Sequence, residues 1–139
     1  MNLNILSPKK DVFSGKVKEV YVPTDNGEYG IFENHSPMIL NLSMGEIKFI
    51  EENGKERIVV ISEGIVDIKL NEVNINVLTG LYPNEIDIEK IEKEKAKLEE
   101  KLKDLKNQKD TNKITSKLKL HSLHISSYNK HIRSKERPL

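Results

Sequence analysis

His35 is the residue of this sequence best suited to acid–base chemistry, and it lies between Glu33 and Ser36. A histidine can act as a general base when a nucleophile and an orienting partner both come within about 3 Å of it. Neighbouring residues seldom converge in that way, and the Ser36-Pro37 pair is typical of a backbone turn. We therefore expect residues 25–39 to form a turn or an exposed contact loop rather than a catalytic site.

His121 and His124 form a second candidate, because residues three apart lie on one face of a helix. Imidazoles bind transition metals, but a site needs further ligands. The chain contains no cysteine, and no carboxylate beside these histidines completes a ligand set. The sequence also lacks a Walker phosphate loop, a GxSxG motif and an HExxH motif. We expect no metal site, no bound cofactor and no catalytic residue.

The composition limits the size of the hydrophobic core. Of the 139 residues, 36% are hydrophobic, 5% are aromatic and 32% are charged. This length suits one domain, or one small domain with an appendage. No segment approaches the ~20 apolar residues that a membrane helix needs, and the first residues do not have the pattern of a secretory signal. We expect a soluble protein without direct membrane insertion.

Charge is distributed unevenly along the chain. Residues 1–84 contain 8 Lys or Arg and 12 Asp or Glu, residues 85–109 contain 8 of each, and residues 110–139 contain 7 and 2. The last segment therefore carries a net charge of +5, which indicates an acidic partner. Tyr128 is its only aromatic residue, whereas surfaces that bind single-stranded nucleic acid interleave several. We expect a protein partner and no nucleic acid.

The first half of the chain has the pattern of short strands separated by turns. Expected strands span residues 16–24, 46–50, 57–62, 65–70 and 73–79. In the last two, the residues expected to face the core are Val66, Ile68, Leu70, Val73, Ile75 and Val77. Asn53-Gly54 predicts a two-residue type I′ turn with positive φ at both positions. The pattern indicates an antiparallel β-sandwich or barrel.

The second half has the period of helices. Asn84 is the expected N-cap of a first helix, whose apolar stripe is Ile88, Ile91, Leu98, Leu102 and Leu105. Residues 108–112 are expected to break that helix. A second stripe with heptad spacing follows, formed by Ile114, Leu118, His121, Ile125, Tyr128 and Ile132.

These patterns predict an N-terminal antiparallel β-sandwich over residues 1–84 and a C-terminal antiparallel two-helix hairpin over residues 85–139. Each buried apolar residue contributes about 1.5–3 kcal/mol, while fixing each backbone residue costs roughly 1–2 kcal/mol. The few apolar residues of each helix barely offset that cost. We therefore expect the hairpin to change conformation or undock without disturbing the sandwich.

Several motifs together resemble the epsilon subunit of F-type ATP synthases. GEYGIFENHSPM, at residues 27–38, is similar to the G-E-[FL]-G-I-x-x-x-H-x-P-[LM] segment of that family. FSGKV at residues 13–17 is similar to its first strands. Residues 62–68 and 73–77 are similar to its S-x-G-I-V-x-[IV] and V-x-[IV]-x-V runs. The resemblance covers essentially the whole chain.

The resemblance implies a noncatalytic subunit of the rotary central stalk, with a sandwich that grips the gamma subunit and rests on the ring of c subunits. The implied docking residues are Glu28, Tyr29, His35, Pro37 and Met38. Of these, Glu28 would lie toward the c ring and His35 toward gamma. The protein would be peripheral to the cell inner membrane, on its cytoplasmic side.

In that family the hairpin can fold onto the sandwich or extend along gamma, where it inhibits ATP hydrolysis by contacting acidic segments of the catalytic alpha and beta subunits. The residues implied to make that contact here are Lys117, Lys119, Lys130 and Arg133.

Some relatives bind ATP in the folded hairpin through an [IL]-D-x-x-R-A motif and arginines of the second helix. Here Asp87 matches that motif, but Lys90 replaces its arginine and Ile91 replaces its alanine. Lysine cannot reproduce the planar, bidentate grip of a guanidinium on phosphate. We therefore expect weak or absent ATP binding.

Two other classes of protein are compatible with the residues alone. One is a β-sandwich protein-binding adaptor with a coiled-coil tail, unrelated to ATPases. The other is a small hydrolase that uses His35 and a carboxylate, for which His35→Ala would abolish an activity of the isolated chain.

Overall fold

The computed structural model describes residues 1–104 and 108–134. The chain forms two compact units, Met1–Tyr82 and Pro83–Leu139. The division falls at Pro83, which has no N–H to donate to a strand ladder. The sequence predicts this boundary two residues later, after residue 84.

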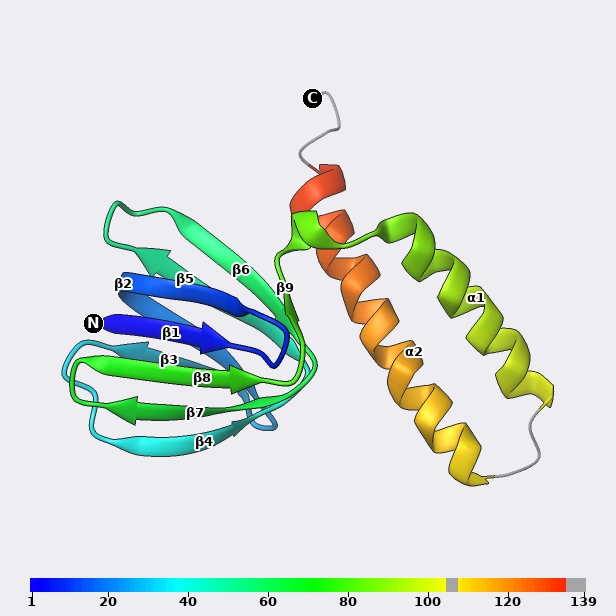
Figure 1. Ribbon diagram of the computed structural model, residues 1–139, viewed down its shortest axis with the longest axis horizontal. Helices are drawn as coiled ribbons and strands as arrows, with labels where there is room; N and C mark the ends of the chain where they lie inside the picture. Colours follow the sequence, from blue (N-terminus) through cyan, green and yellow to red (C-terminus); the bar gives the residue numbers. More distant parts are fainter. Residues whose placement is uncertain (105–107, 135–139) are drawn as a thin grey trace. The chain divides into compact units, whose positions relative to one another are not determined.

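The first unit is a β-sandwich, drawn in blue to green in Figure 1. Its strands follow the order β4-β7-β8-β1-β2-β5-β6-β9, with β3 paired to β2. Their bounds are β1 Asn2–Leu6, β2 Asp11–Thr24, β3 Gly27–Phe32, β4 Met38–Leu42, β5 Gly45–Glu51, β6 Glu56–Ile61, β7 Gly64–Lys69, β8 Glu72–Val77 and β9 Gly80–Leu81. The strands pair antiparallel except β1 and β8, which run parallel.

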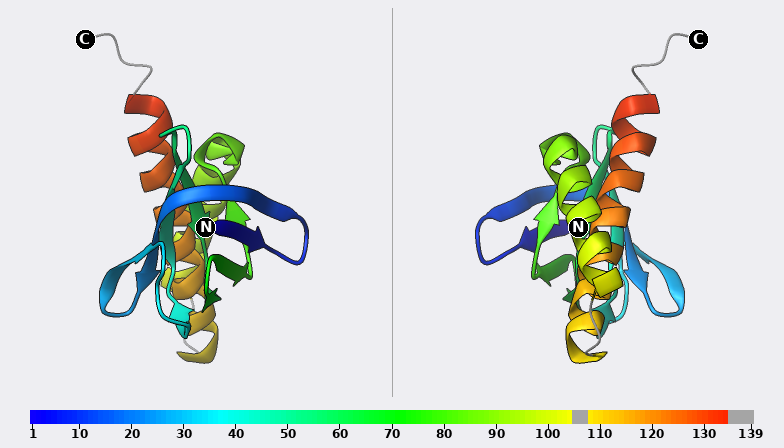
Figure 2. Two further views of the ribbon diagram at one scale, coloured as in Figure 1. Left: turned by 90° about the vertical axis from the view of Figure 1, so that its left-hand side faces the viewer. Right: turned by 90° about the vertical axis from the view of Figure 1, so that its right-hand side faces the viewer.

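Strand β2 joins the two layers of the sandwich. Its first residues pair with β1, while residues from Val17 onward pair with β3 and β5 of the other layer. The register between β2 and β5 shifts between Val17 and Glu19, as at a β-bulge. Bulges bend a strand and increase its twist. Figure 2 shows the resulting arch of this long strand, in blue.

Alternation places the core residues as the sequence predicts along most of β7 and β8. Val66, Ile68, Val73, Ile75 and Val77 are buried. Leu70, which was also expected to face the core, is instead 65% exposed. It lies in the turn after β7, where Asn71 adopts a positive φ of 63°, so the alternation of the strand has already ended.

The turn at Asn53-Gly54 is present, but its type differs from the prediction. Gly54 has a φ of 89°, and Asn53 is not among the described residues with positive φ. The Gly54 amide donates to the Glu51 carbonyl, and the Glu51 amide donates to the Lys55 carbonyl. These bonds define a three-residue loop, in which a glycine in the left-handed region follows a type I turn.

The second unit is the predicted pair of antiparallel helices, seen side by side in Figure 1. It begins with a short 3-10 turn, η1, followed by two α-helices and a final π-helical segment, η2. Their bounds are η1 Pro83–Glu85, α1 Ile88–Asp104, α2 Gln108–Tyr128 and η2 Asn129–Arg133. The expected helix break at residues 108–112 is wrong, because these residues begin α2. They contain neither glycine nor proline, and aspartate and threonine are tolerated in a first turn.

Asp87, rather than Asn84, caps the first helix. The Asp87 carboxylate accepts a hydrogen bond from the Lys90 amide, at 3.3 Å, and its carbonyl accepts one from the Ile91 amide, at 3.0 Å. Asn84 instead belongs to η1. The apolar stripe of α1 is only half-buried at Ile88, Ile91, Leu98 and Leu102, and Leu105 lies outside the described residues.

Candidate docking surfaces

The loop between β3 and β4 is positioned by the β2–β3 hairpin. Tyr29 stands opposite Val22 in that hairpin. After β3 the chain turns back at Asn34, which has a φ of 63°, a region that asparagine tolerates better than most residues. The turn brings His35 back toward Tyr29, and Met38 then opens β4.

Tyr29, His35 and Met38 form one cluster, which is called the Tyr29 cluster below. The Tyr29 hydroxyl lies 2.8 Å from His35 Nε2 and 3.3 Å from Met38 Sδ, and the Tyr29 and His35 rings meet edge to face with centroids 5.7 Å apart. His35 Nδ1 lies 2.6 Å from the Ser36 carbonyl, which can only accept. Nδ1 therefore carries a proton, and in the neutral ring Nε2 accepts the Tyr29 hydroxyl proton.

This geometry disagrees with His35 as a general base. Both ring nitrogens already have partners within the loop. Glu33 lies 3.3 Å from the Met1 amino group instead of orienting the imidazole, and the Ser36 contact is made by its carbonyl rather than its hydroxyl. The hydrogen bonds fix the shape of the loop.

The other two expected docking residues lie at the margins of the Tyr29 cluster. Glu28 is exposed at the tip of the β2–β3 hairpin, opposite Pro23. Its charge lies near the Tyr21 phenol, whose pKa is raised first by a hydrogen bond to Glu19 and further by burial and the charges of Glu19 and Glu28. Pro37 is exposed within the loop.

The loop continues into an exposed apolar strand. Met38 is 37% exposed and the following Ile39 is 70% exposed, although both belong to β4 at one end of the strand order. Large exposed apolar side chains beside a rigid polar cluster are typical of a protein-binding surface. The exposure of Ile39 was not predicted, because β4 was not among the strands expected from the sequence.

The four basic residues assigned to the hairpin do not form one patch. Lys119 and Lys130 are exposed and lie about 20° apart around the axis of an ideal helix, three turns from each other. Lys117 lies roughly 200° from Lys119 around the same axis. Arg133 is half-buried and is held by α1.

Arg133 makes three interactions within the hairpin. Its Nη1 donates to the Asn129 side-chain oxygen at 2.9 Å, its Nη2 donates to Glu92 Oε1 at 3.3 Å, and its guanidinium lies 5.4 Å from the Tyr128 ring. On another side of α1, His121 Nε2 lies 3.6 Å from Glu94 Oε2. Neither carboxylate could be assigned from the sequence, because no short motif connects residues that meet only across the hairpin.

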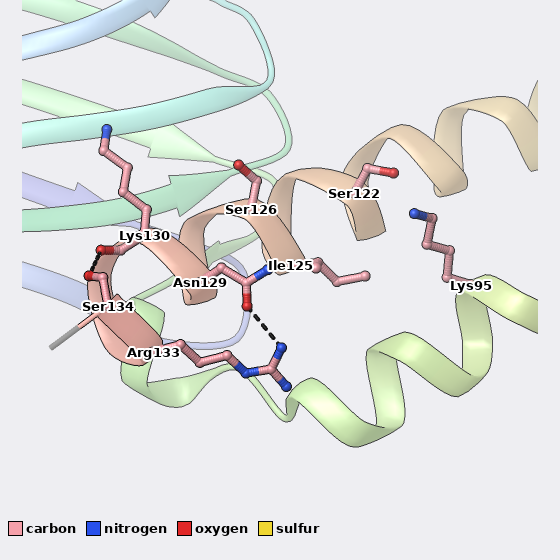
Figure 3. Close-up of a pocket in the computed structure, with 8 residues that line it drawn as sticks. All are labelled: Lys95, Ser122, Ile125, Ser126, Asn129, Lys130, Arg133 and Ser134. Carbon is pink, nitrogen blue, oxygen red and sulfur yellow. Dashed lines mark hydrogen bonds between the residues drawn. The ribbon is translucent and has the colours of Figure 1, made fainter. Parts of the chain in front are cut away.

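A groove of about 650 Å³ in the hairpin is lined by Lys95 of α1 and by residues of α2 and of the segment that follows it (Figure 3). Those residues are Ser122, Ile125, Ser126, Asn129, Lys130, Arg133 and Ser134. The Ser134 hydroxyl donates to the Lys130 carbonyl, and Figure 3 shows the Asn129–Arg133 hydrogen bond across the end of the groove. Cations, hydroxyls and an amide favour an anion, but Arg133 is already paired with Glu92.

The residues of the degenerate ATP motif lie at the start of the hairpin. Asp87 caps α1, Lys90 is exposed and Ile91 is half-buried in the apolar stripe. None of these three lines the groove.

His124 is buried, with 6% exposure, and neither ring nitrogen has a hydrogen-bond partner among residues 1–104 and 108–134. Burial lowers the pKa of this imidazole below its usual 6.5, and the nearby His121 lowers it further. No group of three or more His, Cys, Asp or Glu side chains within the described part of the chain could hold a metal ion. No described helix is long and apolar enough to cross a membrane.

Comparison with known proteins places the fold in a defined class. The family model for "ATP synthase, Delta/Epsilon chain, beta-sandwich domain" matches residues 1–81. An ATP synthase epsilon chain of Delftia acidovorans is 30% identical over 130 residues, which cover 94% of each chain. That of Clostridium acetobutylicum is 36% identical over 107 residues, 77% of this chain and 80% of the relative.

The chain belongs to the ATP synthase epsilon-chain family. An adaptor unrelated to ATPases is thereby excluded. Solved structures with the same fold include a chain of the Euglena gracilis mitochondrial ATP synthase (TM-score 0.77, 21% identity, 90% of this chain and 79% of that one). Another is from the Tetrahymena thermophila mitochondrial ATP synthase central stalk and c ring (TM-score 0.66, 16% identity, 91% and 95%).

Proposed function

We propose that this protein is a noncatalytic rotor subunit of a membrane-bound F-type ATP synthase, which couples ion-driven rotation of the c ring to ATP synthesis through the gamma subunit. The observation that carries the proposal is the Tyr29 cluster. Its hydrogen bonds are satisfied within the loop and hold an exposed apolar strand beside it. Such a loop is suited to docking and holds no activated nucleophile.

A continuous core suits the sandwich to the transmission of torque. Its core is continuous across both layers, and β2 belongs to both of them. Close-packed interiors have low compressibility and transmit strain. Within the docking surface, Glu28 is assigned to the c-ring contact, and the Tyr29 cluster with Pro37 is assigned to the gamma contact.

The hairpin is proposed to act as an inhibitor of ATP hydrolysis when it extends toward the catalytic subunits. Lys117, Lys119, Lys130 and Arg133 supply the positive charge for their acidic segments. Binding of ATP is proposed to be weak or absent, because Asp87 is committed to capping α1 and Arg133 to Glu92. Calorimetry that gave a micromolar dissociation constant for ATP would contradict this.

Copurification with the gamma subunit tests the docking role. Wild-type chain should bind purified gamma, and His35→Ala should weaken that binding by removing the group that orients the Tyr29 hydroxyl. Lys55→Ala, in the exposed β5–β6 turn, is the matched control and should bind like the wild type. A wild-type chain that ignores gamma, or that hydrolyses a substrate by itself, would overturn the proposal.

Complexes reconstituted in membranes test the proposed location. The protein should bind these membranes only while the c ring and gamma are present, since its attachment to the cytoplasmic side of the cell inner membrane is proposed to be peripheral. Glu28→Gln should weaken the attachment to the c ring without affecting binding to isolated gamma.

A further inference from the structure

We propose that Glu92 takes the place of a carboxylate of the catalytic subunits and pairs with Arg133 while the hairpin is closed. The hairpin is called closed when α1 and α2 lie side by side, and open when they are separated. The inference rests on the proposed inhibitory function of the hairpin and adds a regulatory residue to it. Glu92 would compete with an acidic segment of the catalytic subunits for one guanidinium. Arg133 could then not pair with Glu92 in the closed hairpin and with the catalytic subunits at the same time.

The pair joins opposite ends of the hairpin sequence. Glu92 lies near the beginning of α1, and Arg133 is the last residue of η2, 41 positions later. The two can meet only when α1 and α2 lie side by side. The Glu92–Arg133 contact is therefore present in the closed hairpin and lost when the helices separate.

The side chains around Arg133 orient its guanidinium to bind a carboxylate. Asn129 holds Nη1 at 2.9 Å and the Tyr128 ring lies beside the guanidinium, so its orientation is fixed from within α2 and η2. Nη2 then points to Glu92, at 3.3 Å. Because Asn129 and Tyr128 are on the same segment as Arg133, they can orient the guanidinium equally well toward an external carboxylate after opening.

The strength of the pair suits a reversible restraint. Both side chains are about half exposed, Glu92 at 45% and Arg133 at 43%. An ion pair at such exposure changes an equilibrium by roughly 1.4- to five-fold. The apolar stripe of α1 is only half-buried, so the ion pair adds to a weak apolar contact between the helices.

The distance between α1 and α2 in solution tests whether Glu92 holds the hairpin closed. The chain has no cysteine, so Lys97→Cys and Ser116→Cys give unique sites for spin labels on α1 and α2. Glu92→Gln should raise the open fraction by about 1.4- to five-fold. Glu100→Gln, an exposed residue of the same helix, should leave it unchanged.

The charge exchange Glu92→Arg with Arg133→Glu separates closing from inhibition. The exchanged pair should restore the closed fraction of the wild type, but the carboxylate that it introduces at position 133 would repel an acidic partner. ATP hydrolysis by the assembled complex should therefore be inhibited more strongly by Glu92→Gln than by the wild type, and less strongly by the exchanged variant.

The outcomes distinguish this inference from the function on which it rests. If Arg133→Gln raises hydrolysis but Glu92→Gln leaves the open fraction and the inhibition unchanged, the role of Glu92 is wrong while inhibition stands. If Arg133→Gln and removal of the whole hairpin both leave hydrolysis unchanged, the inhibitory function itself is wrong. Failure of the exchanged pair to restore closing also overturns the inference.

Discussion

At the scale of single residues, the shape of the loop between β3 and β4 depends on one phenol. The Tyr29 hydroxyl reaches both His35 and Met38, which follow the turn at Asn34. The sequence identified these residues through their family motif, but it could not show that they touch. Their contact arises from the backward turn of the loop, which no local pattern of polar and apolar residues encodes.

Replacing Tyr29 by Phe should weaken gamma binding, because the loop loses the hydroxyl that donates to His35 and contacts Met38. Stability of the sandwich should fall by only about 0.5–1.5 kcal/mol, the usual net value of one hydrogen bond. Tyr82→Phe is the control, since the Tyr82 hydroxyl donates to the Val12 carbonyl at 2.9 Å, away from the loop. Equal loss of gamma binding in both variants would contradict a specific role for the loop.

His124 predicts a dependence of hairpin stability on pH. Burial lowers its pKa in the folded state below 6.5, so the unfolded state binds the proton more tightly. The contribution of His124 is therefore complete above pH 6.5 and is lost as the pH falls below that value. Thermal unfolding at about pH 7.5 and about pH 5.5, on either side of the ordinary histidine pKa, measures the loss, which should shrink in His124→Leu. An unchanged pH dependence in that variant would count against this assignment.

At the scale of elements, alternation and period were informative inside strands and helices but not at their ends. Val73, Ile75 and Val77 face the core as predicted, because a two-residue period leaves no alternative once one face is buried. The prediction that Leu70 faces the core was wrong, because this residue lies in the turn after β7. The prediction that residues 108–112 break the helix was wrong, because polar residues can begin a helix as well as end one. End points depend on caps and tertiary contacts.

The cap of α1 illustrates this point and can be tested. Asp87→Ala should destabilise the hairpin by about 0.5–2 kcal/mol, because the Lys90 amide loses its acceptor, whereas Asp87→Asn should retain most of the stability. Asn84→Ala is the control, since η1 rather than α1 contains it. Helical circular dichroism during thermal unfolding provides the measurement. A larger loss for Asn84→Ala than for Asp87→Ala would contradict the assignment of the cap.

At the scale of the whole molecule, the two units differ in how much apolar surface they bury. Nearly all buried apolar residues belong to Met1–Tyr82, and among the described residues of the second unit only Ile86 and Ile114 join the large buried aliphatic side chains. The sequence predicted this contrast, because each helix contains only a few apolar residues that could be buried. It could not predict which ion pairs would supplement them.

Native-state hydrogen exchange should reflect the contrast. Amides of α1 and α2 should exchange faster than amides of β1, β2 and β8, because local opening of the hairpin exposes little apolar surface. Comparison at one pH and temperature within the same sample provides the control. Equal protection in both units would show that the hairpin does not open independently of the sandwich.

The central claim is that a stiff sandwich docks on the rotor while a weakly held basic hairpin restrains hydrolysis. ATP hydrolysis by complexes assembled with residues 1–84, compared with the full chain, tests it most directly. The account predicts that the shortened chain still binds gamma and that hydrolysis rises. Unchanged hydrolysis, with gamma binding intact, would contradict it.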